Sequence, residues 1–267
     1  MSLRIKKVFQ NNSKKLATFT TGGDPDIKTS IKIIETIISN KTDIIEIGMP
    51  FSDPMADGPT IQLSSNRSIN NGTNLNDIFS ITNQIRKINN EIPIILMGYY
   101  NVIYYFGVKK FVDECKKNGV DGLIIVDLQP EEDGELFKEL KKNNISLIRL
   151  ITPTTNESRL KLILSNASGF LYYVTITGIT GQNSADLNEL ERSIKFIKSH
   201  SNLPIIAGFG IKDSNDVKEI CNITDGAVVG SSIVKIIEKN ISDNDKMIIK
   251  INDFIKNLKL GTKIWIG

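Results

Sequence analysis

The sequence predicts a (β/α)8 TIM barrel, an α/β fold, formed by a single domain over residues 1–267 with an extra N-terminal helix. Short apolar or β-branched runs alternate eight times with longer helical patterns. Several runs, such as IIV and IIA, are apolar without interruption, as in parallel strands that are buried on both sides. No low-complexity tract or linker divides the chain. A doubly wound open sheet is the alternative, although it seldom needs eight such units.

The predicted elements follow from where each apolar run begins and ends. Turn residues announce several strands, as Asp225-Gly226 does, and Asp213 or Ser214 is a plausible helix N-cap. We interpret residues 92–108 as a strand followed by an aromatic loop. The predicted strands are 16–21, 43–48, 93–98, 122–127, 145–151, 169–175, 203–208 and 226–230. The predicted helices lie near 3–10, 27–39, 74–89, 108–118, 131–143, 156–165, 186–199, 213–221, 231–240 and 245–259, the first of them closing the barrel floor.

Composition excludes several classes of function. The net charge is only +3, and lysines occur in scattered pairs such as Lys116-Lys117, so we expect no nucleic-acid partner. Cys115 and Cys221 are too few for a disulfide framework or a thiolate metal cage, and we expect both to be buried. His200 is the only histidine, so acid–base chemistry falls to carboxylates, lysine or tyrosine, and we expect no metal site.

The N-terminal stretch MSLRIKKVFQNNSKK lacks a continuous apolar segment of the kind found in secretory signals. The longest uncharged segment, 92–108, contains Pro93 and Gly98 and is marginal in length for a membrane span. We therefore expect a cytoplasmic protein with no membrane association.

Glycines gather in the loops after the last three predicted strands. Barrel active sites lie at the carboxyl ends of the strands, and the loops after strands seven and eight recurrently bind phosphate. Glycine lets the backbone approach a ligand closely, and a helix N-terminus adds unpaired N–H donors. Any one of these glycines could merely serve a turn, but three such loops at one barrel end predict a phosphorylated ligand. The residues concerned are Gly178, Thr180, Gly181, Gly208, Gly210, Gly230 and Ser231.

A glutamate interrupts the apolar run DIIEIG. Because side chains alternate along a strand, Glu46 points into the barrel if Ile45 and Ile47 pack against the outer helices. Burial would raise the pKa of this carboxyl and suit it to acid–base catalysis. An interior lysine that satisfies Glu46 structurally is the alternative, but few lysines lie within the predicted strands.

Two aspartates follow in the loop FSDPMADGPT. Asp57 could act as a second carboxylate across a ligand from Glu46, or it could cap a helix that begins near Thr60, and spacing alone leaves both open. We interpret Asp53 as a turn former. Aromatic residues at strand ends, Phe19 and Tyr99 among them, suit rim packing or a flat apolar ligand.

These motifs together resemble the tryptophan synthase alpha chain family. The resemblance runs in order through nearly the whole chain, and the block IEIGMPFSDPMADGPTIQ is its most specific part. The other matching stretches are TFTTGGDP, MGYYN, VDGLIIVDLQPEE, TGITG, GFGI and VVGSSIVKIIE. The resemblance implies a lyase of L-tryptophan biosynthesis that cleaves indole-3-glycerol phosphate to indole and glyceraldehyde 3-phosphate by a retro-aldol reaction.

The resemblance also implies residue roles. Glu46 is the general acid–base group and Asp57 stabilises the charged indole ring N–H. Thr180 lies in a loop that closes over the substrate. The residues that match phosphate contacts are Gly181, Gly210, Gly230 and Ser231, and those that match the indole pocket are Phe19, Ile61, Tyr99 and Tyr172.

No cofactor is implied on this chain, and pyridoxal phosphate belongs to a partner beta chain in an α2β2 heterotetramer. The loop at Asp53 and Pro54 and the segment from Tyr99 to Tyr105 would face that partner. Gln129 departs from the proline common in the family, and the tail KIWIG has no family role that we can assign.

Two other functions remain open at this point. Another phosphate-binding barrel, such as a phosphosugar isomerase or a flavin enzyme, would explain the glycine loops but not the block from Glu46 to Asp57. The chain could also act mainly as an allosteric activator of its partner.

Overall fold

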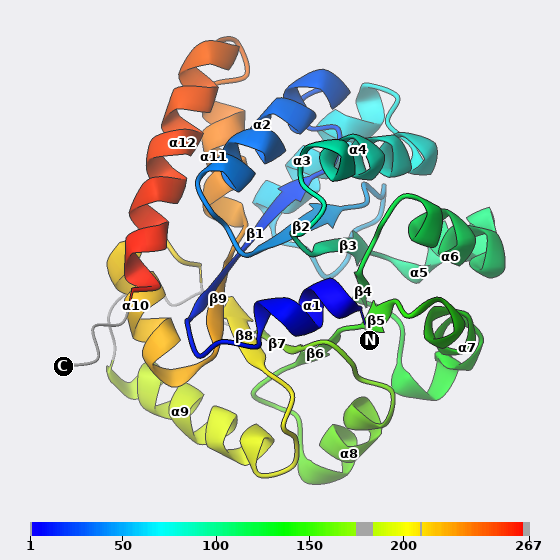
Figure 1. Cartoon of the computed structure of the whole chain (residues 1–267), viewed down its shortest axis with the longest axis vertical. Coiled ribbons are helices and arrows are strands. Elements are labelled where there is room, and N and C mark those ends of the chain that lie inside the picture. The colour runs from blue at the N-terminus through cyan, green and yellow to red at the C-terminus, as the bar shows by residue number, and fades with distance from the viewer. Residues whose placement is uncertain (1, 175–183, 209, 264–267) are drawn as a thin grey trace.

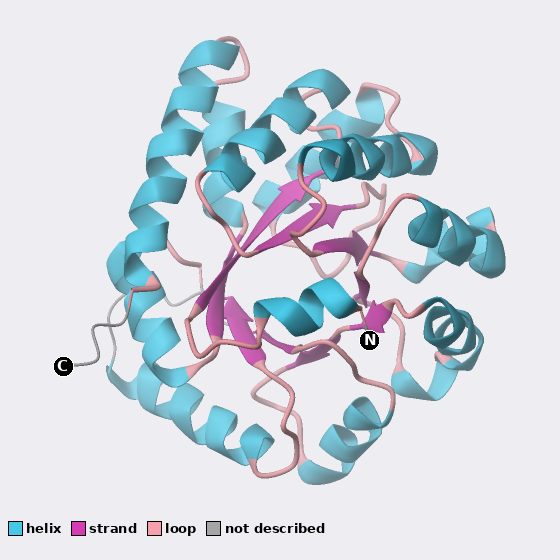
Figure 2. Cartoon of the chain, in the orientation of Figure 1, coloured by secondary structure: helices cyan, strands magenta, loops and turns pink. Residues whose placement is uncertain are grey.

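Parallel strands form the wall of a nearly closed barrel in the computed structural model, which describes residues 2–174, 184–208 and 210–263. Figure 2 shows the strands as an inner ring and the helices as an outer one. The strands are β1 (Lys15–Thr21), β2 (Ile44–Gly48), β3 (Ile94–Gly98), β4 (Gly122–Ile125), β5 (Ser146–Leu147), β6 (Arg149–Ile151), β7 (Leu171–Val174), β8 (Ile205–Gly208) and β9 (Gly226–Val229). The predicted barrel is confirmed.

The predicted strand 145–151 divides into β5 and β6 at Ile148. β5 pairs with β4 and β6 pairs with β7, so the sheet order begins at β5 and ends at β6. The Ile148 N–H still donates to the Leu123 carbonyl at 2.9 Å. One stretch of chain therefore passes from one neighbour to the other, which brings the two ends of the sheet together.

Helices alternate with the strands around the outside of the barrel (Figure 1). They are α1 (Leu3–Val8), α2 (Ile27–Ser39), α3 (Pro59–Asn70), α4 (Leu75–Ile88), α5 (Tyr100–Phe106), α6 (Val108–Lys117), the 3-10 turn η1 (Pro130–Glu132), α7 (Gly134–Asn143), α8 (Glu157–Ser165), α9 (Ser184–Lys198), α10 (Ser214–Ile223), α11 (Ser231–Lys239) and α12 (Asn244–Gly261). The predicted N-cap at Asp213 is confirmed, since its side chain accepts from the N–H groups of Asn215 and Asp216. Cys115 and Cys221 are unpaired and buried, as predicted.

Two helices differ from the prediction. Residues 100–106 form α5 rather than an aromatic loop, with its first N–H donating to the Asp127 side chain at 2.8 Å and Ile103 buried. A bond from a distant strand end thus overrides the β propensity of these aromatic residues. The helix α3 starts at Pro59 with Gly58 as its N-cap and no side-chain cap bond, so Asp57 does not cap it.

Apolar side chains fill two separate layers. The outer layer lies between strands and helices and contains Ile45 and Ile47. The inner layer fills the barrel itself and contains Ile44 together with Ile5 of α1. Figure 1 shows α1 lying across one end of the barrel, so the predicted N-terminal helix does close the floor.

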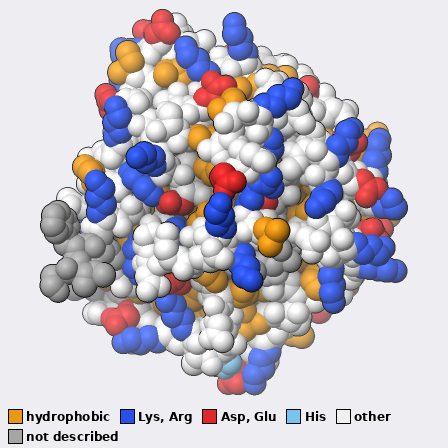
Figure 3. All heavy atoms as spheres, viewed as in Figure 1, with side chains coloured by type: hydrophobic (Ala, Val, Ile, Leu, Met, Phe, Trp, Pro, Cys, Tyr) orange, Lys and Arg blue, Asp and Glu red, His pale blue; other side chains and the backbone are white. Residues whose placement is uncertain are grey.

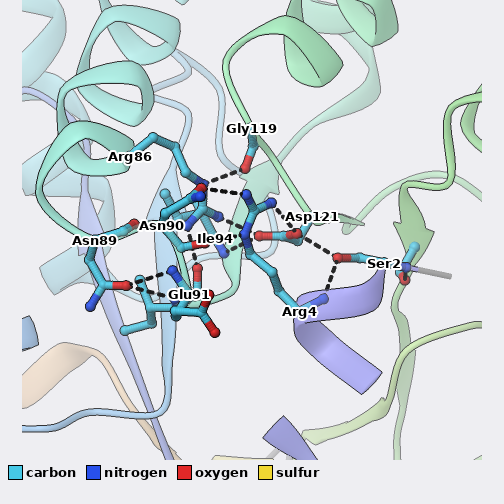
Figure 4. Close-up of polar contacts among 11 residues, drawn as sticks. Ser2, Arg4, Arg86, Asn89, Asn90, Glu91, Ile94, Gly119 and Asp121 are labelled. Atoms are coloured by element: carbon cyan, nitrogen blue, oxygen red, sulfur yellow. Dashed lines mark hydrogen bonds and ion pairs between the residues drawn. The ribbon is translucent and has the colours of Figure 1, made fainter. Parts of the chain in front are cut away.

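A polar network fastens α1 to that floor (Figure 4). Asp121, immediately before β4, is 2% exposed and accepts from the Ser2 hydroxyl, from Arg4 Nη1 at 3.2 Å and from Arg86 Nη2. It also accepts from the backbone N–H of Ile94 at 3.0 Å. Because these groups come from α1, α4 and two strands, the network joins elements that are far apart in the sequence.

The exposed surface carries charges of both signs. Lysine and arginine side chains are interspersed with acidic ones on the face in Figure 3, without a continuous basic stripe among the described residues of that face. Of the helices that the structure describes, none is sufficiently long and apolar to cross a membrane.

Candidate active site

Glu46 lies on the inner face of β2, where alternation places it. Its neighbours Ile45 and Ile47 belong to the outer layer and Ile44 to the inner one. Strand pairing sets Glu46 beside Phe19 of β1 on one side and Ile95 of β3 on the other. The inward orientation predicted from the sequence is therefore confirmed.

The carboxyl group of Glu46 is completely buried, and neither oxygen has a hydrogen-bond partner among the described residues. Burial raises the pKa of Glu46 to about 8, because the charged form loses its hydration. Lys15, the buried lysine of β1, bonds Asn11 and Ser13 instead. The structure thus does not support the alternative of a lysine-satisfied glutamate, and it places a proton-exchanging group in an apolar setting.

The ring of Phe19 occupies the space above Glu46. Gly48 is the next inward-facing position of β2 toward the carboxyl end, and a Cβ added there would stand 2.7 Å from the Phe19 ring. A glycine at this position therefore lets an aromatic ring lie against the strand.

Asp57 lies in the β2–α3 connection and is half-buried. Burial raises the pKa of its carboxyl, while a hydrogen bond from the Tyr99 hydroxyl lowers it. The backbone N–H of Ala56 donates to the same hydroxyl at 3.0 Å. Tyr99 itself is 2% exposed and follows β3, so two neighbouring loops meet at this point.

One cavity of about 200 Å³ opens at the carboxyl ends of the strands. Its wall includes eight residues that the sequence analysis singled out: Phe19, Asp57, Ile61, Tyr172, Gly208, Gly210, Gly230 and Ser231. Tyr172 lies close enough to Glu46 and Asp57 for their charges to raise the pKa of its hydroxyl, although burial is the larger cause. The cavity therefore brings an apolar wall and both carboxylates into one neighbourhood.

The far side of the cavity is made of backbone. Gly230 is the N-cap of α11, and Ser231 is its first residue, so the unpaired N–H groups of a helix start face this side. Gly210 has a φ of +59°, a conformation that glycine adopts without strain. This arrangement suits an anionic group such as a phosphate.

Four of the predicted site residues are not part of the cavity wall as described. Glu46 is buried behind the wall, and Tyr99 contacts Asp57 without lining the cavity. Thr180 and Gly181, like Gly178, lie outside the residues that the structure describes.

Five further residues line the cavity without having been selected from the sequence. They are Met97, Val174, Ile211, Val228 and Ser232. Val228 belongs to the inner layer together with Ile95, and Met97 packs against that layer. Strand alternation could therefore have identified both Met97 and Val228 as inward-facing. The Ser232 hydroxyl donates to the Ile211 carbonyl at 2.6 Å, which ties the start of α11 to the loop after β8.

A larger cavity, of about 480 Å³, lies at the opposite end of the barrel. It is lined by residues that precede β1 and β9, among them Lys14 and Asp225, and by none of the predicted site residues. We assign the site by its chemistry rather than its size. No group of three or more metal-ligating side chains occurs within residues 2–174, 184–208 and 210–263.

Comparison with known proteins gives consistent matches. A family model described as tryptophan synthase alpha chain matches residues 5–263. The tryptophan synthase alpha chain of Geotalea uraniireducens (strain Rf4) is 41% identical over 264 residues, which is 97% of this chain and 98% of the relative.

Solved structures agree with this result. Tryptophan synthase subunit alpha from Legionella pneumophila has a TM-score of 0.90 at 31% identity, over 98% of each chain. A structure of Mycobacterium tuberculosis tryptophan synthase has the same fold, with a TM-score of 0.88 at 24% identity over 98% of this chain and 97% of that one.

Proposed function

Because this chain belongs to the tryptophan synthase alpha chain family, we propose that its reaction takes place in the cavity at the carboxyl ends of the strands. Family membership makes the chain a lyase of L-tryptophan biosynthesis, which cleaves indole-3-glycerol phosphate to indole and glyceraldehyde 3-phosphate. The observation that supports this cavity is that Asp57 and an amide-rich helix start line one apolar space, while Glu46 is buried directly beside Phe19 of its wall.

In the proposed mechanism, Glu46 is the proton-transfer group. As a carboxylate it takes the proton from the glycerol hydroxyl next to the ring, so that a carbonyl forms as the carbon–carbon bond breaks toward the indole. Glu46 also helps to protonate indole C3. Its pKa of about 8 suits both directions of transfer near neutral pH, since either form is accessible there.

Asp57 is proposed to stabilise the ring N–H while positive charge develops on the indolenine tautomer. An ionised carboxylate in a partly buried site interacts strongly with such a charge. The phosphate would sit at the start of α11, where Gly230 and Ser231 line the cavity, with Gly210 beside it. Phe19, Ile61 and Tyr172 would hold the indole ring.

We further propose that this chain needs no cofactor of its own and works with a pyridoxal-phosphate-bearing beta chain in an α2β2 heterotetramer. Three large apolar side chains are well exposed near the cavity end: Met55 (81%), Tyr104 (68%) and Tyr105 (93%). They belong to the β2–α3 connection and α5, which the Ala56–Tyr99 bond joins. Exposed apolar side chains on two segments that are bonded to each other are the kind of surface that a partner protein would cover.

The two unpaired, buried cysteines fit a reducing compartment, and we propose that the chain works in the cytoplasm. Fractionation of cells that produce the tagged chain tests this location.

The experiment that tests the catalytic proposal is an assay of glyceraldehyde 3-phosphate production from indole-3-glycerol phosphate. We expect Glu46→Gln to abolish turnover nearly completely while substrate binding persists, because the amide cannot accept the proton. For the native chain, we expect kcat/KM to rise with pH toward about 8. Wild-type turnover by the variant would refute the role of Glu46.

The same assay tests the partner. We expect weak activity from the chain alone and a marked rise when a beta chain is added. Equal rates with and without the beta chain would contradict the proposed assembly.

A further inference from the structure

Tyr99 is buried, yet its hydroxyl meets the functional group of a neighbouring loop. The side chain is 2% exposed, and its ring lies against Phe51 with the centroids 5.2 Å apart. The hydroxyl oxygen accepts from the Ala56 N–H at 3.0 Å, and the hydroxyl proton is donated to the Asp57 carboxylate. One tyrosine thus holds both the backbone and the carboxylate of the β2–α3 connection.

Two effects oppose each other at Asp57. Burial raises the pKa of the carboxyl and so favours the neutral form, whereas the bond from Tyr99 favours the ionised form. In return, burial and the nearby charge of Asp57 raise the pKa of the Tyr99 hydroxyl, which keeps it a donor. The other titratable groups nearby are Tyr172, the adjoining Glu46, and Asp127 close to Tyr99.

We infer that Tyr99 is a positioning residue, whose hydroxyl is held by the Ala56 N–H and orients the adjacent Asp57 carboxylate at the cavity wall. The consequence for turnover rests on the role proposed above for Asp57. The contact itself does not rest on it, because it is a property of the resting protein.

The test is Tyr99→Phe, which keeps the ring and removes only the hydroxyl. In carbon-13 NMR of the full chain with labelled aspartate carboxyls, we expect the Asp57 titration midpoint to rise by about one pH unit. Asp57→Asn identifies the resonance. We also expect kcat to fall about tenfold with KM little changed, and the acidic limb of the kcat profile to move to higher pH.

Tyr173→Phe is the matched control. Tyr173 is 1% exposed, and its hydroxyl bonds Ser193 in the outer layer, so this variant also loses a buried hydroxyl contact but not one at the cavity. We expect the control to affect stability without moving the Asp57 midpoint. An unchanged midpoint in Tyr99→Phe, or an equal shift in Tyr173→Phe, would overturn the inference.

A second measurement examines the same bond from its other end, without changing Tyr99. In Asp57→Asn, the pKa of the Tyr99 hydroxyl should fall, as followed by carbon-13 labelling of tyrosine Cζ, because the neighbouring charge is gone. No fall would overturn the inference even if Tyr99→Phe failed to fold. If the native chain did not cleave indole-3-glycerol phosphate, the proposed function would be refuted. The two NMR measurements would still test the contact between Tyr99 and Asp57, because they need no turnover.

Discussion

Glu46 couples the protonation of one side chain to the stability of the chain. Its pKa is about 8 in the folded state and near 4.5 when unfolded, so between these values the folded protein holds a proton that the unfolded chain has lost. The free energy of unfolding therefore falls as pH rises through this window.

Glu46→Gln removes this dependence because glutamine does not titrate. We expect the variant to gain stability relative to the native chain between pH 5 and pH 8, by at most about 1.4 kcal/mol per pH unit. Urea unfolding of both proteins at the two pH values measures the difference. Parallel pH profiles would show that Glu46 is ionised in the folded state.

At the scale of single residues, the sequence was most informative where local geometry decides the outcome. Strand alternation placed Glu46 correctly, because its flanking isoleucines define the outer face. Tyr172, which the family resemblance assigned to the indole pocket, lines the cavity. The contact between Tyr99 and Asp57 was not predictable, since it joins two loops whose relative placement depends on the whole barrel.

Among the elements, α3 depends on a clamp to the β1–α2 connection. Arg67 donates from Nε and Nη2 to the two carboxylate oxygens of Asp24 at 2.8 and 2.9 Å, and the Asp24 side chain is fully buried. The Ser68 hydroxyl adds a bond to the Gly22 carbonyl at 2.6 Å. Because Ile61 lies in the first turn of α3 and Asp57 shortly precedes the helix, this clamp sets one wall of the cavity.

We expect Arg67→Ala to lower the free energy of unfolding by about 3–5 kcal/mol, because it leaves a buried carboxylate without its cation. Urea unfolding measures the loss. Lys109→Ala is the control, since it breaks an exposed ion pair with Asp113 and should change little. Similar small effects for both variants would mean that the clamp does not stabilise α3.

The sequence predicted most elements, but not α5 as a helix or Gly58 as the cap of α3. The outer helices carry clear 3.6-residue patterns, whereas α5 has only seven residues and takes its first bond from Asp127. Gln129, which departs from the family, accepts a bond from Arg159 of α8. Pairings of this kind depend on tertiary structure and leave no periodic signal.

For the molecule as a whole, Asp121 links the N-terminal segment to α4 at the floor of the barrel. Arg86 is only 9% exposed, and burial lowers its pKa to about 10 while the charge of Asp121 acts against that shift. We expect Asp121→Asn to lower the free energy of unfolding by about 3–5 kcal/mol, because Arg86 loses a buried counter-charge.

Urea unfolding with parallel activity assays checks this prediction. The activity of the folded fraction should remain unchanged, because Asp121 lies at the end of the barrel away from the cavity. Reduced activity at unaltered stability would contradict the proposed division between floor and site. The network joins Ser2, Arg4, Arg86 and Asp121, so no local pattern announces it. That residues 1–267 form one domain stays a prediction.

The helix α1 closes the amino-terminal end of the barrel, and the cavity described above lies at the opposite end. Ile5 seals the interior, and tightly packed side chains fill the space between it and the cavity. In the part of the chain that the structure describes, the cavity lies at the carboxyl ends of the strands, so substrate would enter and both products would leave past the same rim. A protein that received indole directly would therefore have to dock over the entrance that the next substrate needs. The opening and closing of that entrance would then decide whether indole leaves before the next substrate enters.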